Sequence, residues 1–191
     1  MKKILTIVAA MFVCVAMHAQ FGDMSEFKNE VYAEYTPYKL HTEGLGLGTS
    51  DNITSFALGY NRYVGIACDG DLKLVAGGKL TYGSKNDFKQ FNVRIPVSIM
   101  YSIPVSESFA IEPYAGINAT IGIVADDDES WYDKDYMDAS RINAGWHAGV
   151  DFAINHFVVG GAYQHDFTNL FDHAGVSGKW SDFEIKVGYR F

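Results

Sequence analysis

The chain has 191 residues, a net charge of −8 at pH 7, and 48% hydrophobic residues. This length suits one domain, and the apolar content is too high for an intrinsically disordered chain. The acidic balance argues against binding to phosphate backbones, so no nucleic-acid partner is expected. The chain also contains 13 Phe, 12 Tyr and 3 Trp, which indicates that a large aromatic surface has a structural or functional role.

Residues 1–19 have the three parts of a secretory signal peptide. Lys2 and Lys3 precede an apolar run over residues 7–17, and Ala19 offers a small residue for cleavage. The apolar run is shorter than the roughly 17–25 residues that a transmembrane helix needs. We therefore predict that residues 1–19 are removed on export.

The predicted exported part, residues 20–191, contains 13 basic and 23 acidic residues, a net charge of −10. Cys68 is its only cysteine, so no internal disulfide is expected. We predict that these residues form one β-domain.

Hydrophobic and polar residues alternate with a period of two, which is the pattern of strands with one apolar and one polar face. The clearest alternation runs from Phe91 to Ile103, where every second residue is apolar. The alternation predicts eight strands, at about 27–36, 53–65, 72–83, 91–103, 109–124, 142–154, 157–168 and 182–191.

The predicted connections alternate in length. Short turns at 67–70, 105–108 and 155–156 fall at one end of the sheet, and the longer segments 37–52, 84–90, 125–139 and 169–178 fall at the other. Short periplasmic turns and longer outer loops are typical of transmembrane barrels. The pattern predicts an all-β, eight-stranded antiparallel up-and-down transmembrane β-barrel with both termini on the periplasmic side.

A soluble barrel or sandwich has the same alternation with its apolar face turned inward. Two features favour a lipid-facing apolar surface. The blocks reach 10–13 residues, and a membrane strand needs roughly 9–11. Aromatic residues also lie near both ends of the apolar rows, as in membrane-interface girdles; they are Tyr101, Phe109, Phe157, Tyr189 and Phe191 at the short-turn end, and Tyr35, Tyr82, Phe91 and Phe167 at the loop end.

The polar face carries small residues and equal numbers of opposite charges. An eight-stranded barrel has just enough room inside for side chains, and buried charges must be paired. We therefore predict an interior charge network that plugs the barrel, made of Lys28, Lys73, Lys79, Arg94, Arg141, Lys186 and Arg190 with Glu30, Glu34, Glu112, Asp151, Asp166, Asp182 and Glu184.

Arg62 does not fit this scheme cleanly, because it continues the apolar row of Phe56, Leu58 and Tyr60. Two explanations remain open. The side chain snorkels to lipid headgroups, or a β-bulge resets the register.

Several segments together resemble the outer membrane protein beta-barrel domain family, a group of small porin-like barrels of diderm bacteria. These segments are Val93 to Tyr101, the turn at Ser106 to Phe109, Glu112 to Gly116, and Val187 to Phe191. The resemblance covers nearly all of residues 20–191 and implies an outer-membrane location. It also implies that Val187, Tyr189 and Phe191 form a signal read by the barrel assembly machinery. The family has no shared catalytic motif.

The sequence favours no catalytic, cofactor or metal site. The acidic run from Asp126 to Asp138 has Trp131 where a calcium-binding EF-hand loop needs glycine, so an outer loop is the simpler interpretation. His147 and His165 lack the motifs of an enzyme or a metal site. Exposed aromatic residues in the outer loop suggest a contact surface for an extracellular ligand, formed by Trp131, Tyr132 and Tyr136.

These observations predict a monomeric, non-enzymatic outer-membrane protein that displays loops from a plugged barrel, with structural and surface-recognition roles. Its expected partners are outer-membrane lipids and lipopolysaccharide. A narrow pore or transport accessory is the alternative, and a lipid-modifying enzyme is a third, weaker one.

Overall fold

The computed structural model describes residues 28–43, 50–67, 71–106, 108–126, 139–173 and 176–191. Residues 1–19, the predicted signal peptide, lie outside these ranges. Within them, no helix is both long enough and apolar enough to cross a membrane. The strands are β1 (Lys28–Tyr35), β2 (Tyr38–Glu43), β3 (Ser50–Ala67), β4 (Leu72–Lys85), β5 (Phe88–Tyr101), β6 (Ile103–Ser106), β7 (Phe109–Asp126), β8 (Ile142–Ile154), β9 (Phe157–Asp166), β10 (Phe171–His173) and β11 (Val176–Arg190).

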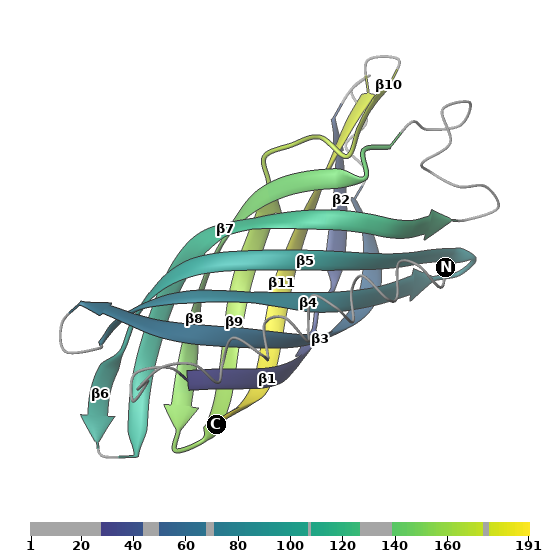
Figure 1. Ribbon diagram of the computed structural model, residues 1–191. Coiled ribbons are helices and arrows are strands. Elements are labelled where there is room, and N and C mark those ends of the chain that lie inside the picture. The colour runs from purple at the N-terminus through teal and green to yellow at the C-terminus, as the bar shows by residue number, and fades with distance from the viewer. Residues whose placement is uncertain (1–27, 44–49, 68–70, 107, 127–138, 174–175) are drawn as a thin grey trace.

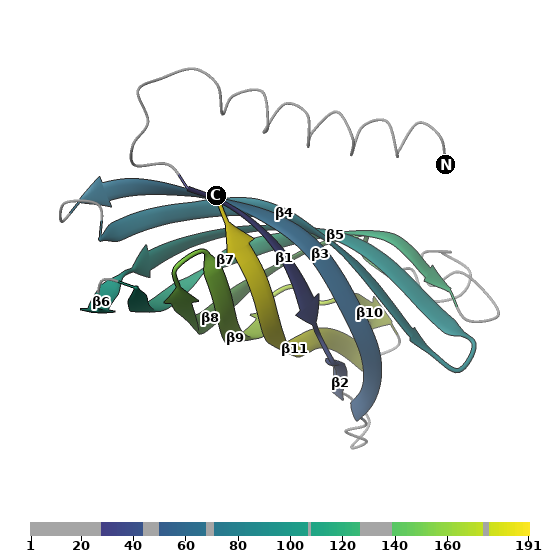
Figure 2. The ribbon, with the colours of Figure 1, turned by 90° about the horizontal axis from the view of Figure 1, so that it is seen from below.

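The strands close into a ring of eight antiparallel neighbours, in the order β1, β3, β4, β5, β7, β8, β9, β11 and back to β1. β2 continues β1 after a break at Pro37, which has no backbone N–H to donate, and β6 continues β5. Figure 1 shows the tilted strands crossing on opposite sides of the ring, and Figure 2 shows them from below. The predicted eight-stranded antiparallel barrel is confirmed.

The strands extend further towards the loop end than the alternation predicts. Residues 84–90 form no medium-length loop, because β4 and β5 meet at a two-residue turn in which Asn86 has a φ of 52°. Asparagine tolerates this left-handed conformation better than most residues. The segments expected as loops at 37–52 and 169–178 contain β2, β10 and the starts of β3 and β11.

Four of these strands continue as a sheet beyond the ring, in the order β3, β2, β11, β10. β2 pairs with Ser50–Ile53 of β3 and with Ser177–Asp182 of β11. The ladder between β3 and β4 begins only at Thr54. We call this four-stranded part the projecting sheet; it lies at the end of the barrel away from the C-terminus (Figure 1).

The two faces of the wall separate apolar from polar side chains. On β11, the outward Phe183, Ile185 and Val187 are about half exposed, whereas Glu184 and Lys186 are buried. β5 behaves in the same way, with Val97 outward at 38% exposure and Ser98 inward at 6%. The buried side chains point into the lumen of the barrel, so the apolar face of the wall is the outer one.

Arg62 stays in the outward row. It pairs in register with Asn29 of β1 and with Ala76 of β4, and both ladders are continuous from Phe56 onward. A bulge does occur in β3, but it lies between Gly65 and Ala67, after Arg62. The bulge explanation is therefore wrong for Arg62, and its side chain lies on the surface that faces the membrane.

Candidate functional site

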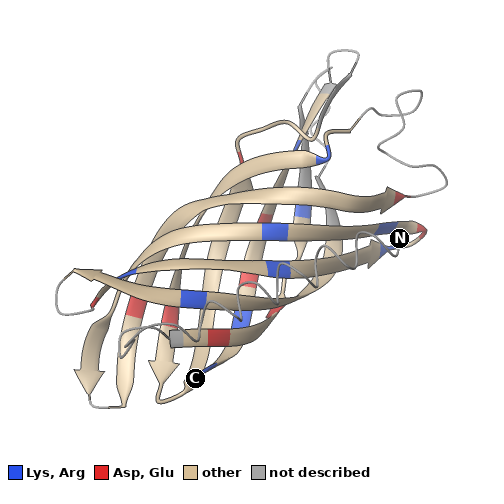
Figure 3. Cartoon of the chain, viewed as in Figure 1, with Lys and Arg blue, Asp and Glu red and all other residues tan. Residues whose placement is uncertain are grey.

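The lumen of the barrel contains most of the charged residues expected there. Lys73 is mostly buried, with 15% of its side chain exposed. The prediction that Arg141 lies in the lumen is wrong, because this residue is exposed in a bend before β8 begins at Ile142. The side chain of Lys28 lies outside the described part of the structure. Buried charged residues lie along the strands (Figure 3); they are Glu30, Glu34, Lys79, Arg94, Glu112, Asp151, Asp166, Asp182, Glu184, Lys186 and Arg190.

Six of these residues form a turn-end cluster, defined as Glu30, Lys73, Glu112, Asp151, Lys186 and Arg190. Arg190 Nε lies 3.0 Å from Glu30 Oε2, and Arg190 Nη1 lies 2.7 Å from Glu112 Oε2. Lys186 Nζ lies 3.0 Å from Glu30 Oε1 and 2.6 Å from Asp151 Oδ2. The six residues come from five strands, so their ion pairs tie much of the ring together.

Each carboxylate of the turn-end cluster has two cationic neighbours. Glu112 also accepts a bond from Lys73 Nζ at 3.2 Å, and Asp151 has Arg190 Nη2 at 4.0 Å. Gly160 makes room for this packing, since a Cβ there would overlap the carboxylate of Asp151. The cluster is thus both balanced in charge and redundantly paired.

Five further residues form a loop-end cluster, defined as Glu34, Lys79, Arg94, Asp182 and Glu184. Lys79 Nζ lies 2.6 Å from Glu34 Oε2 and 2.5 Å from Glu184 Oε1. Arg94 donates from Nη1 to Glu184 at 2.8 Å and from Nη2 to Asp182 at 3.0 Å. In the ring, β5 and β11 have three strands between them in either direction. The pairs made by Arg94 therefore span the diameter of the lumen.

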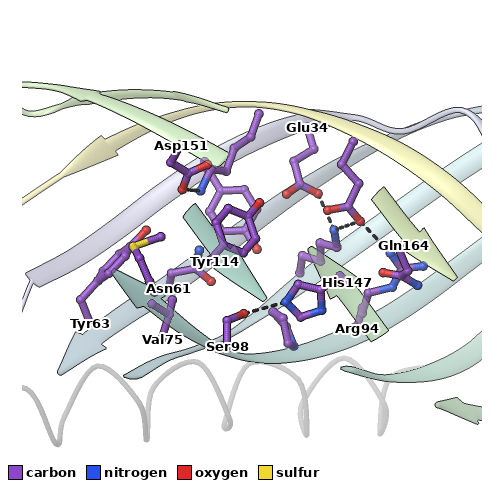
Figure 4. Close-up of a pocket in the computed structure, with 16 residues that line it drawn as sticks. Glu34, Asn61, Tyr63, Val75, Arg94, Ser98, Tyr114, His147, Asp151 and Gln164 are labelled. Carbon is purple, nitrogen blue, oxygen red and sulfur yellow. Dashed lines mark hydrogen bonds and ion pairs between the residues drawn. The ribbon is translucent and has the colours of Figure 1, made fainter. Parts of the chain in front are cut away.

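Between the clusters, neutral polar residues fill the lumen. Ser98 Oγ lies 2.6 Å from His147 Nε2, and the Asn118 amide lies 3.3 Å from His147 Nδ1. Figure 4 shows Ser98 and His147 beside the cavity that Tyr114 and Arg94 also line. This cavity measures about 40 Å³, and one water molecule needs roughly 10–15 Å³ measured in this way. It has room for a few waters.

A small hydrophobic cluster lies at the loop end of the lumen. It joins Tyr38, Ile53 and Trp180 of the projecting sheet to Ala139 and Leu170, all of them buried. The Tyr38 and Trp180 rings meet edge to face with their centroids 5.7 Å apart. The Tyr38 hydroxyl also accepts a hydrogen bond from Arg94 Nη2 at 3.0 Å, so this cap is joined directly to the loop-end cluster.

Tyr38 and Tyr63 also belong to the lumen network, which the sequence pattern did not predict. Tyr63 donates its hydroxyl proton to Glu30 Oε2 at 2.6 Å and accepts a bond from Arg190 Nη2 at 3.1 Å. Tyr38 binds Arg94, as described above. The sequence could have predicted the inward position of Tyr63, because this residue alternates in step with Asn61 and not with Tyr60.

The other predicted site residues lie outside the lumen. Val187, Tyr189 and Phe191 face outward at the turn end, with exposed fractions of 56%, 43% and 60%; their reading by the assembly machinery stays a prediction. The loop residues 131, 132 and 136 lie outside the described residues. Among those that are described, no group of three or more His, Cys, Asp or Glu side chains is arranged to hold a metal ion.

A closed ring with an apolar outer face and an ion-paired interior defines a small transmembrane β-barrel. The family model of the outer membrane protein beta-barrel domain matches residues 6–191. The chain therefore belongs to that family, and its location is the outer membrane. No match was found among curated proteins.

Two solved structures agree on the fold. The chain is similar to the outer membrane enzyme PagL, with a TM-score of 0.55, 12% identity, and coverage of 82% of this chain and 98% of that one. It is similar to Neisserial surface protein A, with a TM-score of 0.50, 13% identity, and coverage of 87% and 98%. A further similarity is to the attachment invasion locus protein Ail of Yersinia pestis, at a TM-score of 0.48, 15% identity, and coverage of 86% and 99%.

Proposed function

We propose that this protein is a monomeric, non-enzymatic outer-membrane anchor that presents its projecting sheet and loops for recognition outside the cell. The observation that carries the proposal is the ion-paired lumen. Arg94 and Lys79 form ion pairs across it, and a cavity beside Ser98 and His147 measures about 40 Å³. A barrel filled in this way serves as a rigid support, and its function is then carried by the sheet and loops that it presents outside the cell.

The projecting sheet supports the same proposal. Its backbone pairing continues beyond the ring, and its residues Tyr38, Ile53 and Trp180 pack against Ala139 and Leu170. Binding residues are often carried on loops that a rigid scaffold holds in place. Here the scaffold continues outward as ordered strands, which would hold the neighbouring loops at a defined distance from the membrane.

Conductance in planar bilayers separates this proposal from a pore. The wild-type protein is expected to give no sustained openings, because the lumen is crossed by ion pairs. Lys79→Ala, which removes a cation that contacts both Glu34 and Glu184, serves as a comparison. Sustained wild-type currents would favour the transport alternative.

Recognition is tested with the protein in nanodiscs against a panel of glycans and extracellular matrix proteins. A variant with Trp131, Tyr132 and Tyr136 changed to serine is expected to lose the binding that the wild type shows. The matched control changes Phe183 and Ile185, which face outward from the wall, and should bind as the wild type does. Equal binding by the loop variant would remove these three residues from the proposal.

A lipid-modifying enzyme is the competing class, since the fold is shared with an enzyme. The Ser98–His147 distance of 2.6 Å fits a nucleophile and its base. Both side chains are buried, at 6% exposure each, and the cavity beside them is too small for a lipid. Incubation with lipopolysaccharide and phospholipids is expected to give no products. Hydrolysis that is lost on Ser98→Ala or His165→Ala would overturn the non-enzymatic assignment.

A further inference from the structure

Asp166 is the one buried charged residue, among those that the structure describes, that belongs to neither ion-pair cluster. The residue is 2% exposed, and none of the ion pairs between described residues includes it. Gln164 Nε2 donates a hydrogen bond to Asp166 Oδ1 at 3.4 Å, which is longer than the usual length of roughly 2.7–3.2 Å. A buried carboxylate without a paired cation is costly, so a cationic ligand would stabilise this part of the lumen.

The surroundings of Asp166 carry an excess of negative charge. Asp182 pairs with Gln164 in the ladder between β9 and β11, so Asp182 is a diagonal neighbour of Asp166 on the lumen side of the wall. Asp182 Oδ1 is buried and accepts no hydrogen bond from the described residues. Arg94 is already paired with Asp182 and Glu184. Adding Asp166 to the three carboxylates and two cations of the loop-end cluster gives four carboxylates against two cations.

A second, smaller cavity lies beside Asp166 at the loop end of the lumen. It measures about 20 Å³, and one water molecule needs roughly 10–15 Å³ measured in this way, so it has room for one water or one ion of similar size. Its lining includes Leu170 and Trp180 of the hydrophobic cluster. The lining also includes four neutral side chains that carry oxygen atoms; they are Gln90, Asn92, Thr120 and Asn143.

We propose that this cavity binds one small monovalent cation of the sodium type, with Asp166 as its charged ligand and neutral side-chain oxygens of the lining as the others. Carboxylate, amide and hydroxyl oxygens suit hard cations. Magnesium usually keeps several waters, for which the cavity has no room, and calcium takes six to eight oxygen ligands, whereas Asp166 is the only carboxylate among the described lining residues.

The proposed site lies between two parts of the protein that the fold brings together. Arg94 of the loop-end cluster and Trp180 of the projecting sheet both line the cavity. A cation bound there reduces the excess of carboxylates and holds the wall of the lumen to the base of the projecting sheet. Its binding should therefore stabilise the folded barrel.

Urea unfolding in phosphatidylcholine vesicles tests the site, with sodium chloride compared with choline chloride at one ionic strength. Choline is too large for the cavity. The unfolding constant of the wild type is expected to be about threefold smaller in sodium, as for a dissociation constant of half the cation concentration. Asp166→Asn should unfold equally in both salts. The matched control is Asp87→Asn, an exposed change in the turn between β4 and β5, which should respond as the wild type does.

The same titration has two outcomes that would overturn the proposal. One is a wild type that is equally stable in the two salts. The other is an Asp166→Asn variant that is less stable than the wild type in choline. The amide has nearly the shape of the carboxylate and carries no charge, so a loss without sodium would mean that the carboxylate has a partner within the protein.

Tryptophan fluorescence gives a second measurement that does not depend on stability. Changing Trp131 and Trp146 to phenylalanine leaves Trp180, which lines the cavity, as the only tryptophan. Its emission is expected to change with sodium until the site is saturated, and to stay constant with choline. An equal response to choline, or a larger one to calcium at the same ionic strength, would overturn the monovalent site. A heat-dependent shift on SDS gels checks that each variant is folded, and the Trp180 response decides alone if Asp166→Asn fails this check.

Discussion

The two ion-pair clusters of the lumen differ in how their charges are shared. In the turn-end cluster, Glu30, Glu112 and Asp151 each have two cationic neighbours. In the loop-end cluster, only Glu184 has two, while Glu34 is paired with Lys79 and Asp182 with Arg94. A carboxylate with two cationic neighbours keeps one of them when the other is removed. A carboxylate with a single cationic neighbour is left unpaired. The turn-end cluster should therefore tolerate substitution better than the loop-end cluster.

The largest effect is expected for Arg94→Leu. It leaves the buried carboxylate of Asp182 without its ion-pair partner and removes one of the two cations at Glu184. Removing one partner of a buried ion pair costs about 3–5 kcal/mol. Urea unfolding in phospholipid vesicles measures this loss. Lys39→Ala, an exposed change on β2, is the control and should leave the free energy of unfolding nearly unchanged.

The wall between the clusters offers the second test, because Val97 and Ser98 are adjacent but face opposite sides. Val97→Lys places a charge among lipids and should cost about 2–4 kcal/mol near the midplane. Ser98→Lys should cost less, since the loop-end cluster has one more carboxylate than cations. The same unfolding titration compares them. The opposite order would contradict the assignment of the outer face.

Lys186→Met tests the redundancy of the turn-end cluster. Arg190 remains near both carboxylates that Lys186 contacts, at 3.0 Å from Glu30 and 4.0 Å from Asp151. The expected loss is about 1–3 kcal/mol, as for buried polar groups with incomplete partners. A loss equal to that of Arg94→Leu would show that the second cation does not compensate.

The smallest effect is expected for Ser98→Ala, which removes the bond to His147 between the clusters. A single neutral hydrogen bond contributes about 0.5–1.5 kcal/mol. Unfolding in vesicles should show a loss in that range. A much larger loss would mean that the neutral segment couples the two clusters.

Some of the predicted loop lengths were wrong for a local reason. The alternation weakens near residues 84–90, where Ser84, Lys89 and Gln90 are all polar, so the sequence pattern favours a loop. Backbone pairing continues there nonetheless, as in Ser84 with Lys89. Arg141 was assigned to the polar face of a strand that begins only at Ile142, so the residue lies before the strand and is exposed.

The sequence by itself determined which side of the wall the residues face wherever the ladder has no bulge. A strand has a period of two, so Val97 faces out because Ser98 faces in, and one apolar row predicts the whole face. The tertiary structure alone decided which charges meet. Arg94 and Asp182 are 88 residues apart in the chain and lie on opposite walls, and their contact depends on the closure and stagger of the ring. A local repeat carries no information about that closure.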